Sequence, residues 1–88
     1  MFVEIVSPAG RVFSGETQGV KAPGVEGSFE VLKNHAPMIA AIEAGPLVLK
    51  DNTGTSITFA TSGGFLEVAD NAVTVLAQTA ELASDIDV

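Results

Sequence analysis

The amino-acid sequence predicts an all-β domain, a sandwich or barrel of about nine or ten short strands. Runs rich in β-branched and aromatic residues recur at short, regular intervals along the chain. Clusters of glycine, proline, asparagine and aspartate separate these runs, as turns between antiparallel strands require. Before residue 78, no long stretch follows the 3.6-residue hydrophobic period of a helix.

The composition limits both the size and the chemistry of the protein. We expect residues 1–88 to form a single domain, because 88 residues, 47% of them hydrophobic, are enough for one core. The sequence has no cysteine, which excludes disulfides, zinc ribbons, iron–sulfur clusters and thiol nucleophiles. The longest apolar run, Ala36–Ile42, is far shorter than the ~20 residues that span a bilayer. We therefore expect no direct membrane insertion.

The charge is strongly acidic and unevenly distributed. The net charge is −7, and residues 51–88 carry six carboxylates without a lysine or arginine. Phosphate neutralisation needs clusters of basic residues, so nucleic acid is excluded as a partner, and an anionic bilayer would repel this surface. The natural complement is a basic patch on another protein.

The first strands are expected near the N-terminus. Phe2–Val6 alternates in polarity as a strand does, and Ser7–Gly10 has the proline and glycine positions of a type I turn. Arg11–Ser14 is the expected return strand, which ends at a bend at Gly15. A weakly alternating segment, Glu16–Ala22, follows.

The middle of the chain alternates between expected loops and short apolar runs. Pro23–Ser28 has the composition of a loop, and Phe29–Leu32 is a short apolar run. A second loop, Lys33–Pro37, leads into Met38–Ile42, whose pattern fits either a buried strand or a single turn of helix. Leu47–Lys50 then begins a hairpin.

The stretch from Ile57 to Ala77 is the clearest part of the prediction. Three strand-like runs are separated by Ser62–Gly64, a bend, and by Asp70-Asn71, a tight hairpin turn whose residues tolerate positive φ. Strands are therefore expected over residues 1–77. Residues 78–88 are expected to form an irregular or partly helical tail, because Ala80, Leu82, Ala83 and Ile86 recur at roughly helical spacing.

The sequence offers little catalytic chemistry. His35 is the one histidine, and no serine is flanked by glycines in the pattern of a nucleophile elbow. No glycine is followed by lysine, so a Walker-type phosphate loop is absent, and one histidine with Glu26 and Glu30 fits metal preferences poorly. We predict no catalytic residue, cofactor, metal or small-molecule substrate. A small hydrolase built around His35 and a free-standing acidic adaptor of sandwich type stay open as alternatives.

Several segments together resemble one family. Gly24–Ile39, with its His-Ala-Pro turn, is similar to a hallmark of the epsilon subunit of F-type ATP synthases, and Thr61–Val68 with Asn71–Ala77 is similar to a second. Val12–Gly15 and Thr79–Asp87 match in order and spacing. The resemblance covers essentially the whole chain.

This resemblance implies a flattened β-sandwich of two sheets and a place in the rotor. It implies a non-catalytic subunit that docks to the gamma subunit and to the membrane ring of c subunits, coupling rotation to ATP synthesis. Glu26, Gly27 and Ser28, with Glu30, align with the loop that meets the c-ring. His35, Ala36 and Pro37 align with a turn that faces gamma.

The sequence also departs from the family pattern. Ser28 stands where members often carry an acidic residue, and Glu30 and Lys33-Asn34 replace the commoner Gly and Pro-Gly. Relatives typically continue into two C-terminal helices that restrain ATP hydrolysis, so a chain without them is expected not to inhibit in that way. The family implies a peripheral location on the cytoplasmic face of a bacterial inner membrane, with the stromal face of thylakoids as the alternative.

Overall fold

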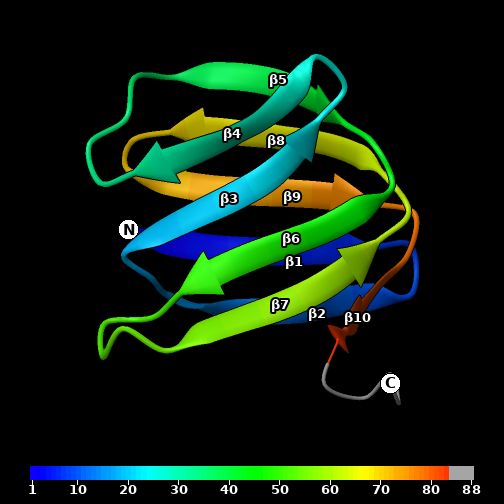
Figure 1. Ribbon diagram of the computed structural model, residues 1–88, viewed down its shortest axis with the longest axis horizontal. Helices are drawn as coiled ribbons and strands as arrows, with labels where there is room; N and C mark the ends of the chain where they lie inside the picture. Colours follow the sequence, from blue (N-terminus) through cyan, green and yellow to red (C-terminus); the bar gives the residue numbers. More distant parts are fainter. Residues whose placement is uncertain (84–88) are drawn as a thin grey trace.

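The structure is a computed structural model that describes residues 1–83 (Figure 1). These residues form ten β-strands and no α-helix, which confirms the predicted all-β class. In chain order the strands are β1 (Phe2–Ser7), β2 (Gly10–Glu16), β3 (Gly19–Gly24), β4 (Gly27–Leu32), β5 (Met38–Ile42), β6 (Gly45–Lys50), β7 (Ser56–Thr61), β8 (Gly64–Ala69), β9 (Ala72–Ala77) and β10 (Ala80–Leu82).

The strands form two layers, as Figure 1 shows. The front sheet has the order β4-β3-β6-β7-β10, and the back sheet has the order β5-β8-β9-β1-β2. One pairing between Gly24 and Ile42 joins the two sheets at their upper edge. Neighbouring strands are antiparallel except for β1 and β9, which run parallel. The sandwich that the sequence predicts is therefore confirmed.

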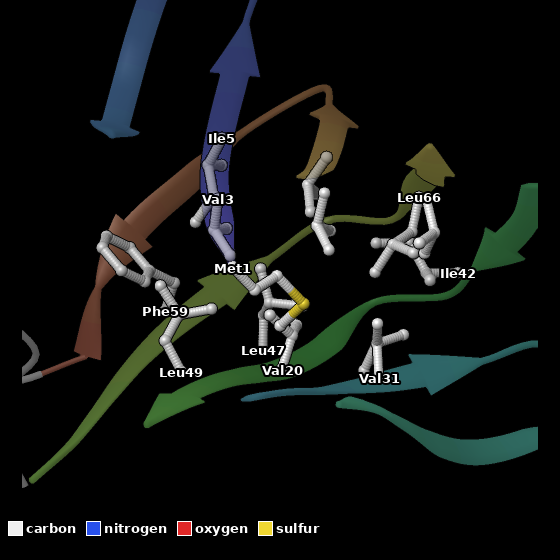
Figure 2. Packing of buried hydrophobic residues seen from close by; sticks show 14 residues of the cluster. Met1, Val3, Ile5, Val20, Val31, Ile42, Leu47, Leu49, Phe59 and Leu66 are labelled. Carbon is white, nitrogen blue, oxygen red and sulfur yellow. The ribbon is translucent and has the colours of Figure 1, made fainter. Parts of the chain in front are cut away.

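The core lies between the two sheets and follows the two-residue period of the strands. In β1, Val3 and Ile5 are fully buried, and in β6 the same is true of Leu47 and Leu49. Figure 2 shows these side chains pointing toward one another from opposite sheets, with Met1 among them. The front and back sheets thus each contribute one apolar face to a single core.

Two predicted turns are confirmed with their backbone geometry. Asp70 and Asn71 join β8 to β9 with φ angles of 52° and 59°, the positive values that a tight hairpin turn requires. The bend at Ser62–Gly64 joins β7 to β8, and Gly63 has a φ of 102°. A β-carbon on Gly64 would overlap the carbonyl oxygen of Leu76, so only glycine fits there.

The prediction of a loop over residues 23–28 was wrong. Pro23 and Gly24 end β3, Gly27 and Ser28 begin β4, and the connecting turn has only two residues. Proline and glycine favour loops by composition, but here a close approach of the two backbones requires the glycine. A β-carbon on Gly24 would lie 2.6 Å from the carbonyl oxygen of Gly27 and 2.8 Å from the ring of Phe29.

Three smaller expectations are also decided. Gly15 lies within β2 instead of forming a bend, and Met38–Ile42 is a strand instead of a helical turn. The helical spacing expected for Ala80 and Leu82 was wrong, because residues 80–82 pair with β7 as the strand β10. Pairing with the edge of β7 satisfies their backbone groups, and both side chains pack against the core. The expectation for Ile86 lies outside the described residues.

Candidate docking surfaces

The turn between β3 and β4 forms the first candidate surface, at one end of the sandwich. Backbone hydrogen bonds join this turn and the end of β3 to β5 and to the connection between β5 and β6. The N–H of Val25 donates to the carbonyl oxygen of Ala41 (3.2 Å), and the N–H of Glu43 donates to that of Pro23 (2.8 Å). The turn therefore holds the exposed Glu26 in a defined position.

Gly27 and Ser28, which follow this turn, differ from the sequence-based expectation in one respect. Both are exposed, yet they lie in β4, and Gly27 has a φ of 123° with open space where a side chain would be. Its positive φ alone explains why glycine stands at this position. Ser28 lies at the start of the strand, opposite Pro23.

Glu30 lies outside the turn that carries Glu26. It lies within β4, opposite Lys21 of β3, on the outer face of the front sheet. Glu43 is instead the second carboxylate near the turn, and sequence reasoning missed it. Its position between a strand and the Gly45 that opens the next strand was the available signal. An open groove of about 550 Å³ runs between the turn and β5.

The loop between β4 and β5 forms the second candidate surface, and it lies at the opposite end of β4 (Figure 1). His35, Ala36 and Pro37 are all exposed. The His35 backbone N–H donates to the carbonyl oxygen of Leu32 at 3.1 Å, and the ring Nδ1 donates to that of Ala36 at 2.7 Å. These contacts shape the turn and leave the three residues at the surface.

Asn34 gives this loop part of its backbone conformation. Its φ is 66°, in the left-handed region that asparagine adopts more readily than most residues. Its backbone N–H donates to the side-chain oxygen of Asn71, in the turn between β8 and β9, at 3.0 Å. Asparagine therefore suits the left-handed backbone conformation that this position of the loop requires.

The His35 ring is exposed, and its hydrogen-bond partner within residues 1–83 is a main-chain carbonyl rather than a carboxylate or hydroxyl. In the same part of the chain, no group of three metal-ligating side chains comes together. No helix among these residues is long and apolar enough to cross a membrane.

The carboxyl group of Asp51 has a shifted pKa. The pKa of Asp51 lies below its usual value because the Thr53 hydroxyl and nearby backbone N–H groups stabilise the carboxylate. Its Oδ1 accepts hydrogen bonds from the Thr53 hydroxyl at 2.7 Å and from the Thr55 N–H at 2.9 Å. This arrangement shapes the hairpin turn between β6 and β7, away from both candidate surfaces.

Comparison with known protein families shows the family to which this chain belongs. The family model described as the beta-sandwich domain of the ATP synthase Delta/Epsilon chain matches residues 1–83. The chain belongs to this family. Membership agrees with the fold and with the resemblance of the two candidate surfaces to the epsilon-subunit hallmarks.

Curated relatives carry the same family name. The ATP synthase epsilon chain of Salinibacter ruber is 58% identical over 94 aligned residues, which cover 98% of this chain and 63% of that protein. The epsilon chain of Syntrophomonas wolfei is 46% identical over 86 residues, with the same two coverages. The chain thus spans about 63% of the length of these relatives.

Solved structures share the fold of this delta/epsilon-family chain. A chain in the mitochondrial ATP synthase of Euglena gracilis (OSCP/F1/c-ring, rotational state 1) superposes with a TM-score of 0.89 at 22% identity. The match covers 97% of this chain and 54% of that one. A chain in the central stalk/c-ring structure of the Tetrahymena thermophila enzyme gives a TM-score of 0.75 at 19% identity, covering 92% and 65%.

Proposed function

We propose that this protein is a non-catalytic rotor subunit of an F-type ATP synthase. It docks to the gamma subunit and to the c-ring and couples ion-driven rotation of the ring to ATP synthesis. The observation that carries the proposal is the family match across residues 1–83, combined with two exposed candidate surfaces at opposite ends of β4. Two surfaces at opposite ends suit a subunit that bridges two partners.

The c-ring contact is assigned to the β3–β4 turn. Glu26 is exposed at its tip, Gly27 and Ser28 follow it, and Glu30 lies further along the same strand. The acidic side chains suit basic groups on the polar loops of the ring, because complementary charge orients and stabilises a protein interface. Glu43, fastened to the same turn, adds a further carboxylate to this end.

The gamma contact is assigned to His35, Ala36 and Pro37. The loop holds them at the surface through hydrogen bonds to Leu32 and Asn71, so the turn is ordered before any partner arrives. Preorganisation of this kind reduces the entropy lost on binding. Within the proposal, the protein is peripheral on the cytoplasmic face of a bacterial inner membrane.

A charge-reversal experiment tests the ring contact. The Glu26→Lys variant and the Glu26→Lys/Glu30→Lys variant are each assembled with gamma and the purified c-ring, and retention on the ring is measured. We expect both variants to bind the ring more weakly and the double variant to bind it less than the single one. Glu81→Lys, a charge reversal of the exposed glutamate in β10, is the control and is expected to bind normally.

If the unaltered protein bound neither gamma nor the c-ring, the rotor function itself would be contradicted. Normal ring binding by the double variant would contradict only the assignment of this contact to the β3–β4 turn.

The proposal also predicts that the purified protein hydrolyses neither ATP nor ester substrates. An ATPase assay of the complex with and without the protein then measures its effect on coupling.

A further inference from the structure

The two edges of the sandwich differ in how they are closed. Nine of the ten strands follow one another in a single pairing path that begins at β10 and ends at β2. At the upper edge, the pairing of Gly24 with Ile42 carries this path from one sheet to the other. At the lower edge, where Figure 1 shows β2, β7 and β10, no strand pairing within residues 1–83 joins β2 to the front sheet. We call the space between β2, β7 and β10 the seam.

The seam is a groove with an apolar lining. Its lining residues come from all three strands: Val12 and Phe13 from β2, Ile57 and Phe59 from β7, and Glu81 and Leu82 from β10. The groove has a volume of about 530 Å³, and an adjoining hollow of about 590 Å³ shares Ile57 and Leu82 with it. The hollow adds the hydroxyl groups of Ser56 and Thr58. Grooves of this size and lining are typical of sites for small organic molecules.

The core holds this lining in place. The rings of Phe13 and Phe59 contact each other edge to face across the two sheets, with centroids 5.6 Å apart and an angle of 63° between their planes. Phe59 is buried in the core, as Figure 2 shows, and Val12, Phe13, Ile57 and Leu82 are partly buried against it. The groove is therefore preformed by strands, and a ligand would bind with little ordering of the protein.

Glu81 gives the groove its charge. It is exposed, and no ion pair engages it within residues 1–83. Residues 51–88 contain no lysine or arginine, and Arg11 of β2 is hydrogen-bonded to Glu4. The net charge of −7 also attracts cations to the protein and repels anions. A ligand with an apolar body and an amine therefore suits the seam better than a fatty acid does.

An added peptide strand suits the seam less well than a small molecule. Strand β10 has only three residues, so the edge that it offers is short. On the other side, the pairing of β2 with β1 is irregular between Ile5 and Val6. Short strands and bulges are features by which sheet edges resist pairing with a further strand. Recognition in the seam would therefore depend on side chains more than on backbone pairing.

We propose that the seam binds a small organic cation with an apolar body, of the arylalkylammonium class. The apolar body lies against Phe13, Ile57 and Leu82, and the ammonium group lies at the rim beside Glu81. The ligand binds without any covalent step and is neither a substrate nor a cofactor. This site is independent of the proposed rotor function, because it includes neither the β3–β4 turn nor the His35 loop.

Three matched probes test the proposal. Phenylbutylammonium has the aromatic body and the positive charge, phenylbutanol has the same body without a charge, and phenylbutanoate has a negative charge. Each is titrated into the isotope-labelled protein, and the amide chemical shifts are followed by NMR. We expect phenylbutylammonium to shift amides of β2, β7 and β10, with a dissociation constant of roughly 1–10 mM for a ligand this small. Phenylbutanol should bind about twofold to fivefold more weakly, as an exposed ion pair implies, and phenylbutanoate more weakly still.

Two substitutions separate the charge from the apolar lining. Glu81→Gln keeps the size of the side chain and should abolish the preference for the ammonium probe over the alcohol. Glu67→Gln, a matched change of an exposed glutamate in β8, is the control and should keep this preference. Val12→Thr nearly preserves the shape of the groove and should weaken all three probes about equally, by roughly twofold or more. Thermal unfolding checks that each variant is folded.

Several results would overturn the proposal. They are an unchanged preference in folded Glu81→Gln, an equal loss of preference in Glu67→Gln, and tighter binding of phenylbutanoate than of phenylbutylammonium. Shifts spread over all acidic surfaces would also overturn it, because they would show a general attraction of cations. Absence of binding to the unaltered protein would do the same. None of these results bears on the rotor function, which association with gamma and the c-ring tests separately.

Discussion

The backbone N–H of Asn34 donates a hydrogen bond of 3.0 Å to the side-chain oxygen of Asn71, across 37 positions of sequence. Both residues have positive φ, and each lies in a connection between strands. The bond links the loop that carries His35 to a hairpin turn of the back sheet. The position of the candidate gamma contact therefore depends on a residue that is distant in sequence.

The Asn34–Asn71 bond predicts a local effect of substitution at Asn71. Asn71→Gly keeps the positive φ and removes the side-chain acceptor, so we expect faster amide hydrogen exchange at Asn34 and a loss of about 1 kcal/mol of stability. Asn71→Ala also forces alanine into the left-handed region, and we expect it to lose about 1 kcal/mol more. Hydrogen exchange and denaturant unfolding check both. Unchanged exchange at Asn34 in Asn71→Gly would contradict a restraining role for this bond.

Gly64 is predicted to be the least replaceable glycine in the bend between β7 and β8. A β-carbon at this position would overlap the carbonyl oxygen of Leu76, in the neighbouring strand. We expect Gly64→Ala to destabilise the fold by more than about 3 kcal/mol. Gly54→Ala is the control, because Gly54 also has a positive φ but has nothing within 4 Å of its missing side chain. Its expected loss is about 1–2 kcal/mol, and thermal unfolding measures both.

Two leucines in adjacent strands should differ in how much they contribute to stability. Leu66 is fully buried in β8, whereas Leu76 is 54% exposed in β9. We expect Leu66→Ala to lower the free energy of unfolding by about 2–5 kcal/mol, because it leaves a cavity in the core. We expect Leu76→Ala to change it by less than about 1 kcal/mol. Chemical denaturation checks the pair, and a loss in Leu76→Ala as large as in Leu66→Ala would contradict the assigned orientation of β9.

Asp51 predicts a contribution to stability that depends on pH. Hydrogen bonds from Thr53 and the following backbone lower the pKa of Asp51 below its ordinary value of 3.8. The carboxylate therefore favours the folded state above pH 3.8, and this contribution is lost as the pH falls through the lower, folded-state pKa. An NMR titration of the Asp51 carboxyl carbon should have its midpoint below 3.8. In Thr53→Val, which lacks the hydroxyl donor, the midpoint should move upward; an unmoved midpoint would exclude the hydroxyl as the main cause.

The parts of the fold that sequence predicts well are those specified by local chemistry. Asp70-Asn71 is predictable because few residue pairs tolerate two consecutive positive φ angles. The buried faces of β8 and β9 follow directly from the alternation of their apolar residues. The same local reasoning explains why the His35 loop and the β3–β4 turn were located correctly as exposed connections, even though the boundaries of the second were wrong.

The remaining features depend on contacts between distant segments. Pro23-Gly24 lies in a strand because the backbone of β4 comes within 2.6 Å of where a side chain would be, and no pattern within β3 reports this approach. Ala80–Leu82 is a strand because the edge of β7 is available to it. Likewise, the exposed apolar side chains of the back sheet come together only through the pairing of β5, β8, β9 and β1. Sequence spacing alone does not bring Ile39, Phe65 and Leu76 together.

The parallel pairing of β1 with β9 has a consequence for biosynthesis. Strand β1 lies between β2 and β9 in the back sheet, so its second edge is covered only after residues 72–77 have been synthesised. Until then the nascent chain exposes an unpaired strand edge, which invites association with other chains. We expect the pairing of the back sheet to be completed late in translation. We also expect ribosome pausing upstream of residue 72 to increase aggregation of the nascent chain.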